Sequence, residues 1–362
     1  MTVPLETWQV GPWNRWAYLH VGEVVPTVAV RRDTGRRWEL PSEEDGALDD
    51  LAAALCETAY ADGVAVVRDG TFVLERYANG MGADTRHLSQ SVGKSVLGLL
   101  VGVLAERGAL HPDAAVADLV PEVAASGYAG ATLQHLLDMT AAIDFVEDYA
   151  VDFWRYDVAC GWHPPHPDVE AGSILEFLPT IGPAAWAHGA RFHYASPNTD
   201  LLGIAAERAG GAPLAELIAT HLWEPLGAEH DAEVTVDPAG TGVISGGFCA
   251  SLRDYSRLGA LVAAGGRGIV PERWAATLGH GDPSAFARTT VPDSTSGTDG
   301  YGTQWWHRDG GPVARGIHGQ MIAVDRRAGV IVTILSSWPY AMDPALEATH
   351  RRFVADVRAR LA

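Results

Sequence analysis

The sequence has 26 basic side chains among its 362 residues, yet only one of them is a lysine, Lys94. Arginine can replace lysine in almost any surface ion pair. A guanidinium, however, does not lose its proton in a protein, whereas a desolvated lysine can become a neutral amine and act as a base. Lys94 follows Ser91 by three residues in the run His87-Leu-Ser-Gln-Ser-Val-Gly-Lys94. The scarcity of lysine therefore points to a chemical role for Lys94.

The sequence also lacks a disulfide framework and a long apolar run. Its three cysteines, Cys56, Cys160 and Cys249, are odd in number and widely spaced, so we expect reduced thiols. The longest apolar run, 96–105, is too short to span a bilayer. The amino terminus shows no basic region followed by an apolar stretch, so we expect a cytoplasmic protein.

Positive charge is scarce overall, because the net charge is -19 and the pI is near 5.0. Nucleic acid and anionic membranes would be repelled, so neither is an expected partner. The pair His163 and His166 has no third ligand nearby, so no metal site is predicted, and we expect no cofactor. A small-molecule substrate remains, and the oligomeric state, including a homodimer, stays open.

Strand signals occur near both ends of the chain. The runs 63–68 and 71–77 are joined by Asp69-Gly70, a tight-turn signal, and a helix over 43–61 precedes them. The runs 320–325 and 329–335 pair across a short turn, and a last helix begins at Asp343-Pro344.

The middle of the chain reads as helices and loops. The segment 91–107 is apolar nearly all round and predicts a buried helix. Further helical stretches are 132–140, 199–209 and 213–226, and 291–302 reads as a mobile loop. We therefore predict an α+β fold with an antiparallel sheet built from both termini. The expected division is a sheet domain of 1–85 and 246–362 and a mainly helical domain of 86–245, with the active site between them.

Ser91 and Lys94 have the spacing of a nucleophile and its base. A serine at a helix start lies beside unpaired backbone N–H groups, which can stabilise an oxyanion. Lys94, one turn later, faces the same way. Base function at pH 7 needs a pKa lowered by roughly 3 units, which burial and a neighbouring hydroxyl can supply. Tyr194, just ahead of a helix, is the candidate to share the proton.

Three motifs in order, Ser91-Val-Gly-Lys94, Tyr194-Ala-Ser196 and Ile317-His-Gly-Gln320, resemble those of the penicillin-recognising serine hydrolases. The resemblance is greatest to the 6-aminohexanoate-dimer hydrolases, which share the class C β-lactamase fold with family VIII carboxylesterases. It covers essentially the whole chain. Further matching segments are Trp13-Asn-Arg-Trp-Ala17, Ile143-Asp-Phe-Val-Glu-Asp-Tyr149, Gln304-Trp-Trp306 and Ser336-Ser-Trp-Pro339.

The resemblance implies a role for each matching residue. Ser91 would be acylated, Lys94 would be its base partner and Tyr194 the proton shuttle. The backbone N–H groups of Ser91 and Ile317 would form the oxyanion hole. The implied substrate-binding residues are Tyr149 on a closing loop, Trp306 as a pocket wall, His318, and Cys160 and Ser245, at whose positions the family varies.

The departures from the family pattern leave the substrate open. β-Lactamases usually place a lysine on the third motif to hold the substrate carboxylate, and no second lysine exists here. His318 could fill part of that position, although a histidine is largely neutral at pH 7. A linear amidase, a carboxylesterase with little amidase activity and a non-catalytic ligand-binding protein all remain compatible with the sequence.

Overall fold

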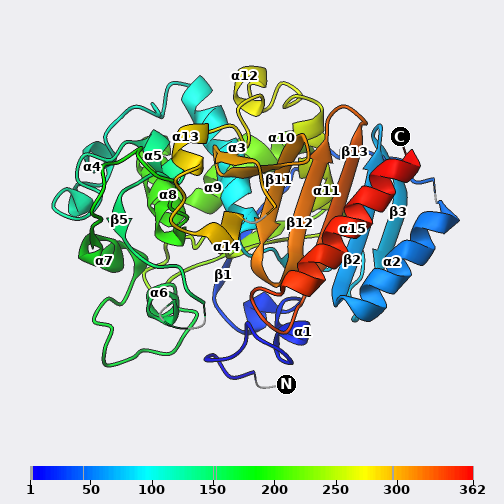
Figure 1. Cartoon of the computed structure of the whole chain (residues 1–362), viewed down its shortest axis with the longest axis horizontal. Helices are drawn as coiled ribbons and strands as arrows, with labels where there is room; N and C mark the ends of the chain where they lie inside the picture. Colours follow the sequence, from blue (N-terminus) through cyan, green and yellow to red (C-terminus); the bar gives the residue numbers. More distant parts are fainter. Residues whose placement is uncertain (1–2, 44, 150, 152, 296, 362) are drawn as a thin grey trace.

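The protein is described by a computed structural model that covers residues 3–43, 45–149, 151, 153–295 and 297–361 (Figure 1). Its main sheet has seven antiparallel strands in the order β3-β2-β13-β12-β11-β10-β9. The bounds of these strands are β2 (Ala61–Arg68), β3 (Thr71–Tyr77), β9 (Gly300–Gly302), β10 (Trp305–Arg308), β11 (Gly311–Gly316), β12 (Gln320–Asp325) and β13 (Val330–Ser336). The predicted α+β fold with an antiparallel sheet built from both ends of the chain is confirmed.

Helices cover both faces of this sheet (Figure 1). Because strand side chains alternate between faces, Val64 and Val66 of β2 pack with α2 (Gly46–Thr58) and α15 (Pro344–Leu361). Ala65 and Val67 point to the opposite face, where the core includes α11 (Leu252–Ala263) and α3 (Val92–Glu106). The first seven residues of β2 are therefore all buried.

The remaining strands form two smaller sheets. One has the order β1-β7-β8-β4, and the other pairs β5 with β6. Their bounds are β1 (Thr27–Val30), β4 (His87–Leu88), β5 (Ile143–Asp144), β6 (Gly182–Pro183), β7 (Ala232–Thr235) and β8 (Phe248–Ala250). The four-stranded sheet joins segments from both sides of the expected boundary at 85/86. The division into two domains therefore stays a prediction.

Short helices fill the middle of the chain and the connections. The remaining α-helices are α1 (Asn14–Ala17), α4 (Val116–Leu119), α5 (Leu133–Leu137), α6 (Trp154–Ala159), α7 (Ile174–Phe177), α8 (Ser196–Gly210), α9 (Leu214–Ile218), α10 (Glu224–Leu226), α12 (Glu272–Ala275), α13 (Pro283–Phe286) and α14 (Pro292–Thr295). Single turns of 3-10 helix are η1 (Val21–Glu23), η2 (Pro121–Val123), η3 (Leu178–Thr180) and η5 (Ile317–Gly319), and η4 (Ala219–Trp223) is a π-helix.

The structure corrects three expected boundaries. The helix predicted over 43–61 is the shorter α2, because the chain has already entered β2 at Ala61. The helix predicted over 213–226 is interrupted by η4 and ends before Gly227, whose left-handed backbone stops it. The loop predicted over 291–302 contains α14 and β9, although Ser296 lies outside the described residues.

Candidate active site

Ser91 lies at the amino-terminal end of α3, in the wall of a cavity of about 370 Å³. The helix is held deep in the protein because it presents glycines to its neighbours. A Cβ at Gly93 would lie 2.4 Å from the carbonyl oxygen of Ile244, so only glycine allows this approach. The first turn of α3 is therefore fixed against the segment that precedes β8, and Ser91 is fixed with it.

Lys94 is buried, with 1% of its surface exposed, and its amine is surrounded by oxygen atoms. Its Nζ lies 2.9 Å from Ser91 Oγ, 2.9 Å from Ser196 Oγ and 2.6 Å from the carbonyl oxygen of Ser245. Ser196 Oγ donates its own proton to a carboxylate, so it accepts from Lys94, as does the carbonyl. A neutral amine has two protons for these acceptors, which leaves its lone pair facing the Ser91 hydroxyl.

The environment of Lys94 favours this neutral form. Burial lowers the pKa of Lys94, while the carboxylates of Glu147 and Asp200 act in the opposite direction. Both carboxylates accept hydrogen bonds from other groups. Tyr156 Oη and the Ser245 N–H donate to Asp200 at 2.6 and 2.8 Å, and burial raises the pKa of Asp200 to about 6.

Tyr194 faces the same group of atoms. Its ring lies 5.2 Å from Lys94 Nζ and stacks on Trp306 with ring centres 5.4 Å apart. Burial and the nearby Glu147 carboxylate raise the pKa of Tyr194, whereas its interaction with Ser91 and the charge of Arg315 lower it. The phenol therefore keeps its proton near neutral pH and can act as a donor.

The end of β11 lies against the backbone of the candidate nucleophile. A Cβ at Gly316 would lie 3.0 Å from the Ser91 nitrogen and 2.4 Å from the Ser89 carbonyl oxygen, so glycine permits this contact. The next residue, Ile317, lines the 370 Å³ cavity together with Ser91. The structure thus brings together the two residues whose N–H groups were predicted to form an oxyanion hole.

The predicted substrate-binding residues lie around Ser91 in two adjoining hollows. Tyr149, Cys160, Ser245 and His318 line the 370 Å³ cavity, and Trp306 lines a hollow of about 50 Å³ that also contains Ser91 and Tyr149. Burial raises the pKa of the Cys160 thiol well above its usual range, so Cys160 is a protonated wall residue.

His318 does not supply the cation that the third motif lacks. It is 1% exposed, and its Nδ1 lies 2.7 Å from the Trp338 carbonyl oxygen. Burial lowers the pKa of His318 to about 4, so its ring is uncharged at neutral pH. Its backbone lies in the left-handed region with φ of 60°, a conformation that the tight turn between β11 and β12 requires.

A cation nevertheless lies beside Ser91, and sequence analysis missed it. Arg315, the last residue before Gly316, lines the 50 Å³ hollow, and its guanidinium carbon lies 5.4 Å from the centre of the Trp306 ring. Arg308 and Arg315 bind the same Glu347 oxygen at 2.8 and 2.7 Å. Arg315 lies two positions before Ile317, the first residue of the third motif, but that position alone did not mark it as a site residue.

Glu147 was also missed, and it connects the site to Tyr149. Its carboxylate accepts hydrogen bonds from the Ser196 N–H at 2.5 Å, from Ser196 Oγ at 2.9 Å and from the Tyr149 hydroxyl. A continuous chain of polar contacts therefore runs from Ser91 through Lys94 and Ser196 to Tyr149. One residue lies between Glu147 and Tyr149, and the hydrogen bond between their side chains is therefore local in the chain.

Two acids, Glu6 and Asp157, lie in the wall of the 370 Å³ cavity. Asp157 on α6 accepts a hydrogen bond from Gln9 at 3.3 Å. Burial raises the pKa of Asp157 to about 7. The Ser91 region therefore has a carboxyl group in one hollow and an arginine in the other. Sequence analysis had no signal for Asp157, because the cavity is formed only when Gln9 and α6 meet.

Among the described residues, no group of three or more His, Cys, Asp or Glu side chains is arranged to hold a metal ion. His163 lines the cavity wall, and its Nδ1 lies 2.9 Å from the Pro164 carbonyl oxygen. Within the same described part of the chain, no helix has both the length and the apolar character needed to cross a membrane.

Comparison with known proteins gives one consistent result. The Beta-lactamase family model matches residues 49–356. The 6-aminohexanoate-dimer hydrolase of Paenarthrobacter ureafaciens is 36% identical over 354 residues, which cover 92% of this chain and 88% of that protein.

Solved structures agree on the fold. A Bacillus anthracis protein, provisionally described as a 6-aminohexanoate-dimer hydrolase, superposes with a TM-score of 0.89 at 23% identity and covers 99% of this chain and 97% of its own. A family VIII carboxylesterase superposes with a TM-score of 0.62 at 18% identity, covering 90% of this chain and 99% of its own. The predicted class C β-lactamase-like fold is in agreement with these similarities.

Proposed function

The chain belongs to the β-lactamase family of serine hydrolases, and from this membership we propose that it hydrolyses linear amides through an acyl-enzyme formed on Ser91. One observation carries the proposal. The single lysine of the sequence is buried with its amine 2.9 Å from the Ser91 hydroxyl, at the edge of a cavity that can admit a small molecule. A lysine buried in this way cannot act as a solvent-exposed surface charge.

In the first step Ser91 Oγ attacks the amide carbonyl carbon while neutral Lys94 accepts the hydroxyl proton. The carbonyl oxygen becomes an oxyanion, which the N–H groups of Ser91 and Ile317 stabilise. Tyr194 gives its proton to the departing nitrogen and regains one from Lys94, so charge is balanced. Water then attacks the ester carbonyl with the same groups acting in reverse, and the acid is released.

Tyr149 supports an amidase over an esterase. An amide nitrogen must be protonated before it leaves, and its lone pair must face the donor Tyr194. An ester oxygen is a better leaving group and needs less orientation. Tyr149 lines both hollows, so its hydroxyl can turn from Glu147 to the scissile nitrogen.

The acidic and basic side chains around Ser91 support a substrate with an ammonium group at one end and a carboxylate at the other. The Paenarthrobacter relative is named after the 6-aminohexanoate dimer. This dimer is a linear amide with a terminal ammonium and a terminal carboxylate. Asp157 lies in the larger hollow and Arg315 in the smaller one. We therefore propose that the acyl half extends towards Asp157 and the leaving amine half towards Arg315.

The direct test is turnover of this dimer by purified protein, with release of 6-aminohexanoate followed by chromatography. We expect multiple turnovers for the wild type and none for Ser91→Ala. Ser95→Ala is the matched control, since Ser95 is a buried serine of the same helix whose hydroxyl donates to the Gln304 carbonyl outside the site. Turnover of p-nitrophenyl esters without any amide would instead indicate a carboxylesterase. Labelling without turnover would indicate a ligand-binding protein.

A further inference from the structure

A second cavity lies at the opposite end of α3 from Ser91. It has a volume of about 570 Å³ and receives side chains from three separate segments and from the end of the helix. Its walls contain four arginines and one histidine against a single acid, namely Arg36, Arg37, Arg107, Arg267, His221 and Glu39. Arg107 directly follows α3, so the rise of the helix puts this cavity roughly 24 Å from Ser91.

Among the described residues, ion pairs neutralise only one of the four arginines of this cavity. Arg37 pairs with Glu229 at 2.7 Å and with Glu39 at 3.3 Å. For Arg36, Arg107 and Arg267, no carboxylate within 4.0 Å is found in the part of the chain that the structure describes. The whole chain has a net charge of -19, so a hollow lined by three arginines that have no acidic partner among the described residues is positively charged where most of the protein is negative.

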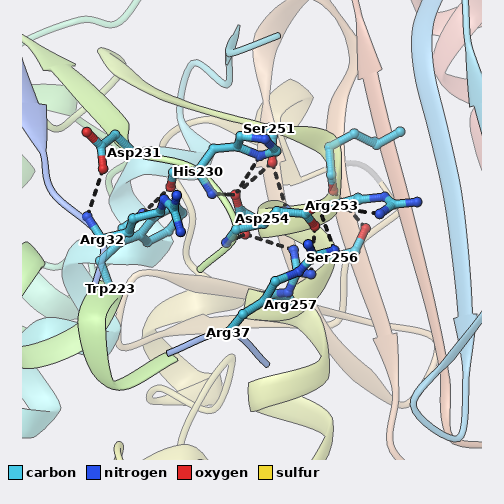
Figure 2. Close-up of polar contacts among 12 residues, drawn as sticks. Arg32, Arg37, Trp223, His230, Asp231, Ser251, Arg253, Asp254, Ser256 and Arg257 are labelled. Atoms are coloured by element: carbon cyan, nitrogen blue, oxygen red, sulfur yellow. Dashed lines mark hydrogen bonds and ion pairs between the residues drawn. The ribbon is translucent and has the colours of Figure 1, made fainter. Parts of the chain in front are cut away.

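The backbone next to Arg36 and Arg37 is held by contacts of Trp38. Figure 2 shows Arg32 and Arg37 reaching a polar network that includes Asp231, Asp254 and Arg257. Arg257, which is 1% exposed, donates through Nε to the Trp38 carbonyl oxygen at 3.0 Å. The Trp38 N–H donates in turn to the Gly227 carbonyl oxygen at 2.8 Å.

Trp38 fixes the position of a further cation. The guanidinium carbon of Arg267 lies 3.6 Å from the centre of the Trp38 ring, which is a close cation–π contact. His221 joins the wall from η4, and π-helical turns of this kind are frequent at functional sites. The carboxyl end of α3 itself favours a cation at Arg107, but that effect does not account for Arg36 and Arg267, which arrive from other segments.

We propose that this cavity binds a small, multiply charged phosphate compound. Guanidinium groups bind phosphate oxygens through paired hydrogen bonds, and several of them around one hollow match the charge of such a ligand. An extended polyanion such as nucleic acid would be repelled by the rest of the surface. The ligand is therefore a small molecule, and its site is separate from Ser91.

Calorimetric titration with inorganic pyrophosphate tests the proposal, with sodium chloride added to keep the ionic strength constant. The wild type should show one saturable site. Arg107→Gln and Arg267→Gln should each weaken binding at least about tenfold, because each removes a charge-assisted hydrogen bond. Both side chains are exposed, so folding should be unaffected. Arg327→Gln is the matched control, because Arg327 is an exposed arginine elsewhere, and it should leave binding unchanged.

Three results would overturn the proposal. They are the absence of saturable heat at millimolar pyrophosphate, an equal loss in the Arg327 variant, and citrate binding as tightly as pyrophosphate. A final arm repeats the titration after a fluorophosphonate has blocked the catalytic serine. Unchanged affinity is expected, whereas loss of binding would put the anion in the catalytic cavity.

Discussion

At the level of single residues, the proposed activity depends on the protonation state of Lys94. Its amine is buried among oxygen atoms that accept two hydrogen bonds, and burial lowers its pKa. If neutral Lys94 is the base, kcat/KM should rise with pH as its proton is lost, over a range below the usual pKa of a lysine.

The variant Lys94→Arg keeps the charge and removes the base. We expect kcat to fall by at least about 10³, the upper part of the range for general base catalysis. Steady-state kinetics on a p-nitrophenyl ester would measure the loss, with circular dichroism to verify the fold. If the variant kept more than about a tenth of the wild-type kcat, Lys94 would have only an electrostatic or structural role.

Arg315 should determine which leaving groups are accepted. Arg315→Gln should raise KM for the 6-aminohexanoate dimer about 10- to 100-fold, because a charge-assisted contact with the substrate carboxylate is lost. The methyl ester of the same dimer lacks this charge and should be little affected. Arg308→Gln removes the other partner of Glu347, but Arg308 does not line the hollow beside Ser91. Equal losses in both variants, or on both substrates, would assign Arg315 to structure alone.

The sequence predicts those site residues that lie within local motifs. Ser91 and Lys94 are one helical turn apart, and Tyr194 precedes a helix, so these residues could be selected from short motifs together with the family resemblance that the motifs carry. Glu147, Asp157 and Arg315 could not be selected in this way. Their importance arises from contacts with residues far away in the chain, such as Ser196 and Gln9, and one sequence contains no measure of those contacts.

At the scale of elements, α3 determines where the nucleophile lies. Its glycines allow neighbouring backbone to approach closely. A Cβ at Gly98 would lie 2.3 Å from the Thr303 carbonyl oxygen, in a turn where Thr303 and Gln304 both have positive φ. Because this turn and the helix contact each other through backbone atoms, neither can move aside easily.

Gly98→Ala should therefore destabilise the protein, although alanine normally favours a helix. We expect a loss of about 1 to 3 kcal/mol in the free energy of unfolding, as for other overpacked cores. Urea unfolding followed by circular dichroism would measure it. Gly46→Ala in α2 is the control, since no atom lies within 4 Å of its added Cβ, and it should be neutral or slightly stabilising. A neutral Gly98→Ala would show that the turn can shift.

Elements with local signals were predicted well. The β2–β3 hairpin turns at Asp69 and Gly70, both with positive φ, as an Asp-Gly turn requires. The four-stranded sheet was not foreseen, because its strands have two to four residues and two of its three pairings, β1 with β7 and β4 with β8, join positions more than 150 residues apart. Such short strands have no periodicity, and only tertiary packing selects them.

At the scale of the whole molecule, buried titratable groups make stability depend on pH. Burial lowers the pKa of His350 to about 3, so the folded state binds its proton less readily than the unfolded chain does. Stability from this group is complete above pH 6.5 and is lost as pH falls towards 3. Asp157 and Asp200, whose pKa values are raised, act in the opposite sense, because their contribution declines as pH rises.

Replacing His350 should remove its contribution to the pH dependence of the unfolding free energy. The difference in unfolding free energy between wild type and His350→Gln should shrink by about 2 to 3 kcal/mol between pH 7 and pH 4.5, following the usual value of about 1.4 kcal/mol for each pKa unit. Urea unfolding at both pH values would measure it. His111→Gln, at an exposed histidine, serves as the control. A difference that stayed constant with pH would mean that His350 is not buried as described.

The central claim is that Ser91 is the nucleophile and that Lys94 activates it. Its most direct test is intact-mass spectrometry after incubation with a fluorophosphonate, followed by peptide mapping. We expect one adduct per chain, located on Ser91, absent in Ser91→Ala and formed far more slowly in Lys94→Arg. An adduct on another residue, or an undiminished labelling rate in the Lys94 variant, would contradict it.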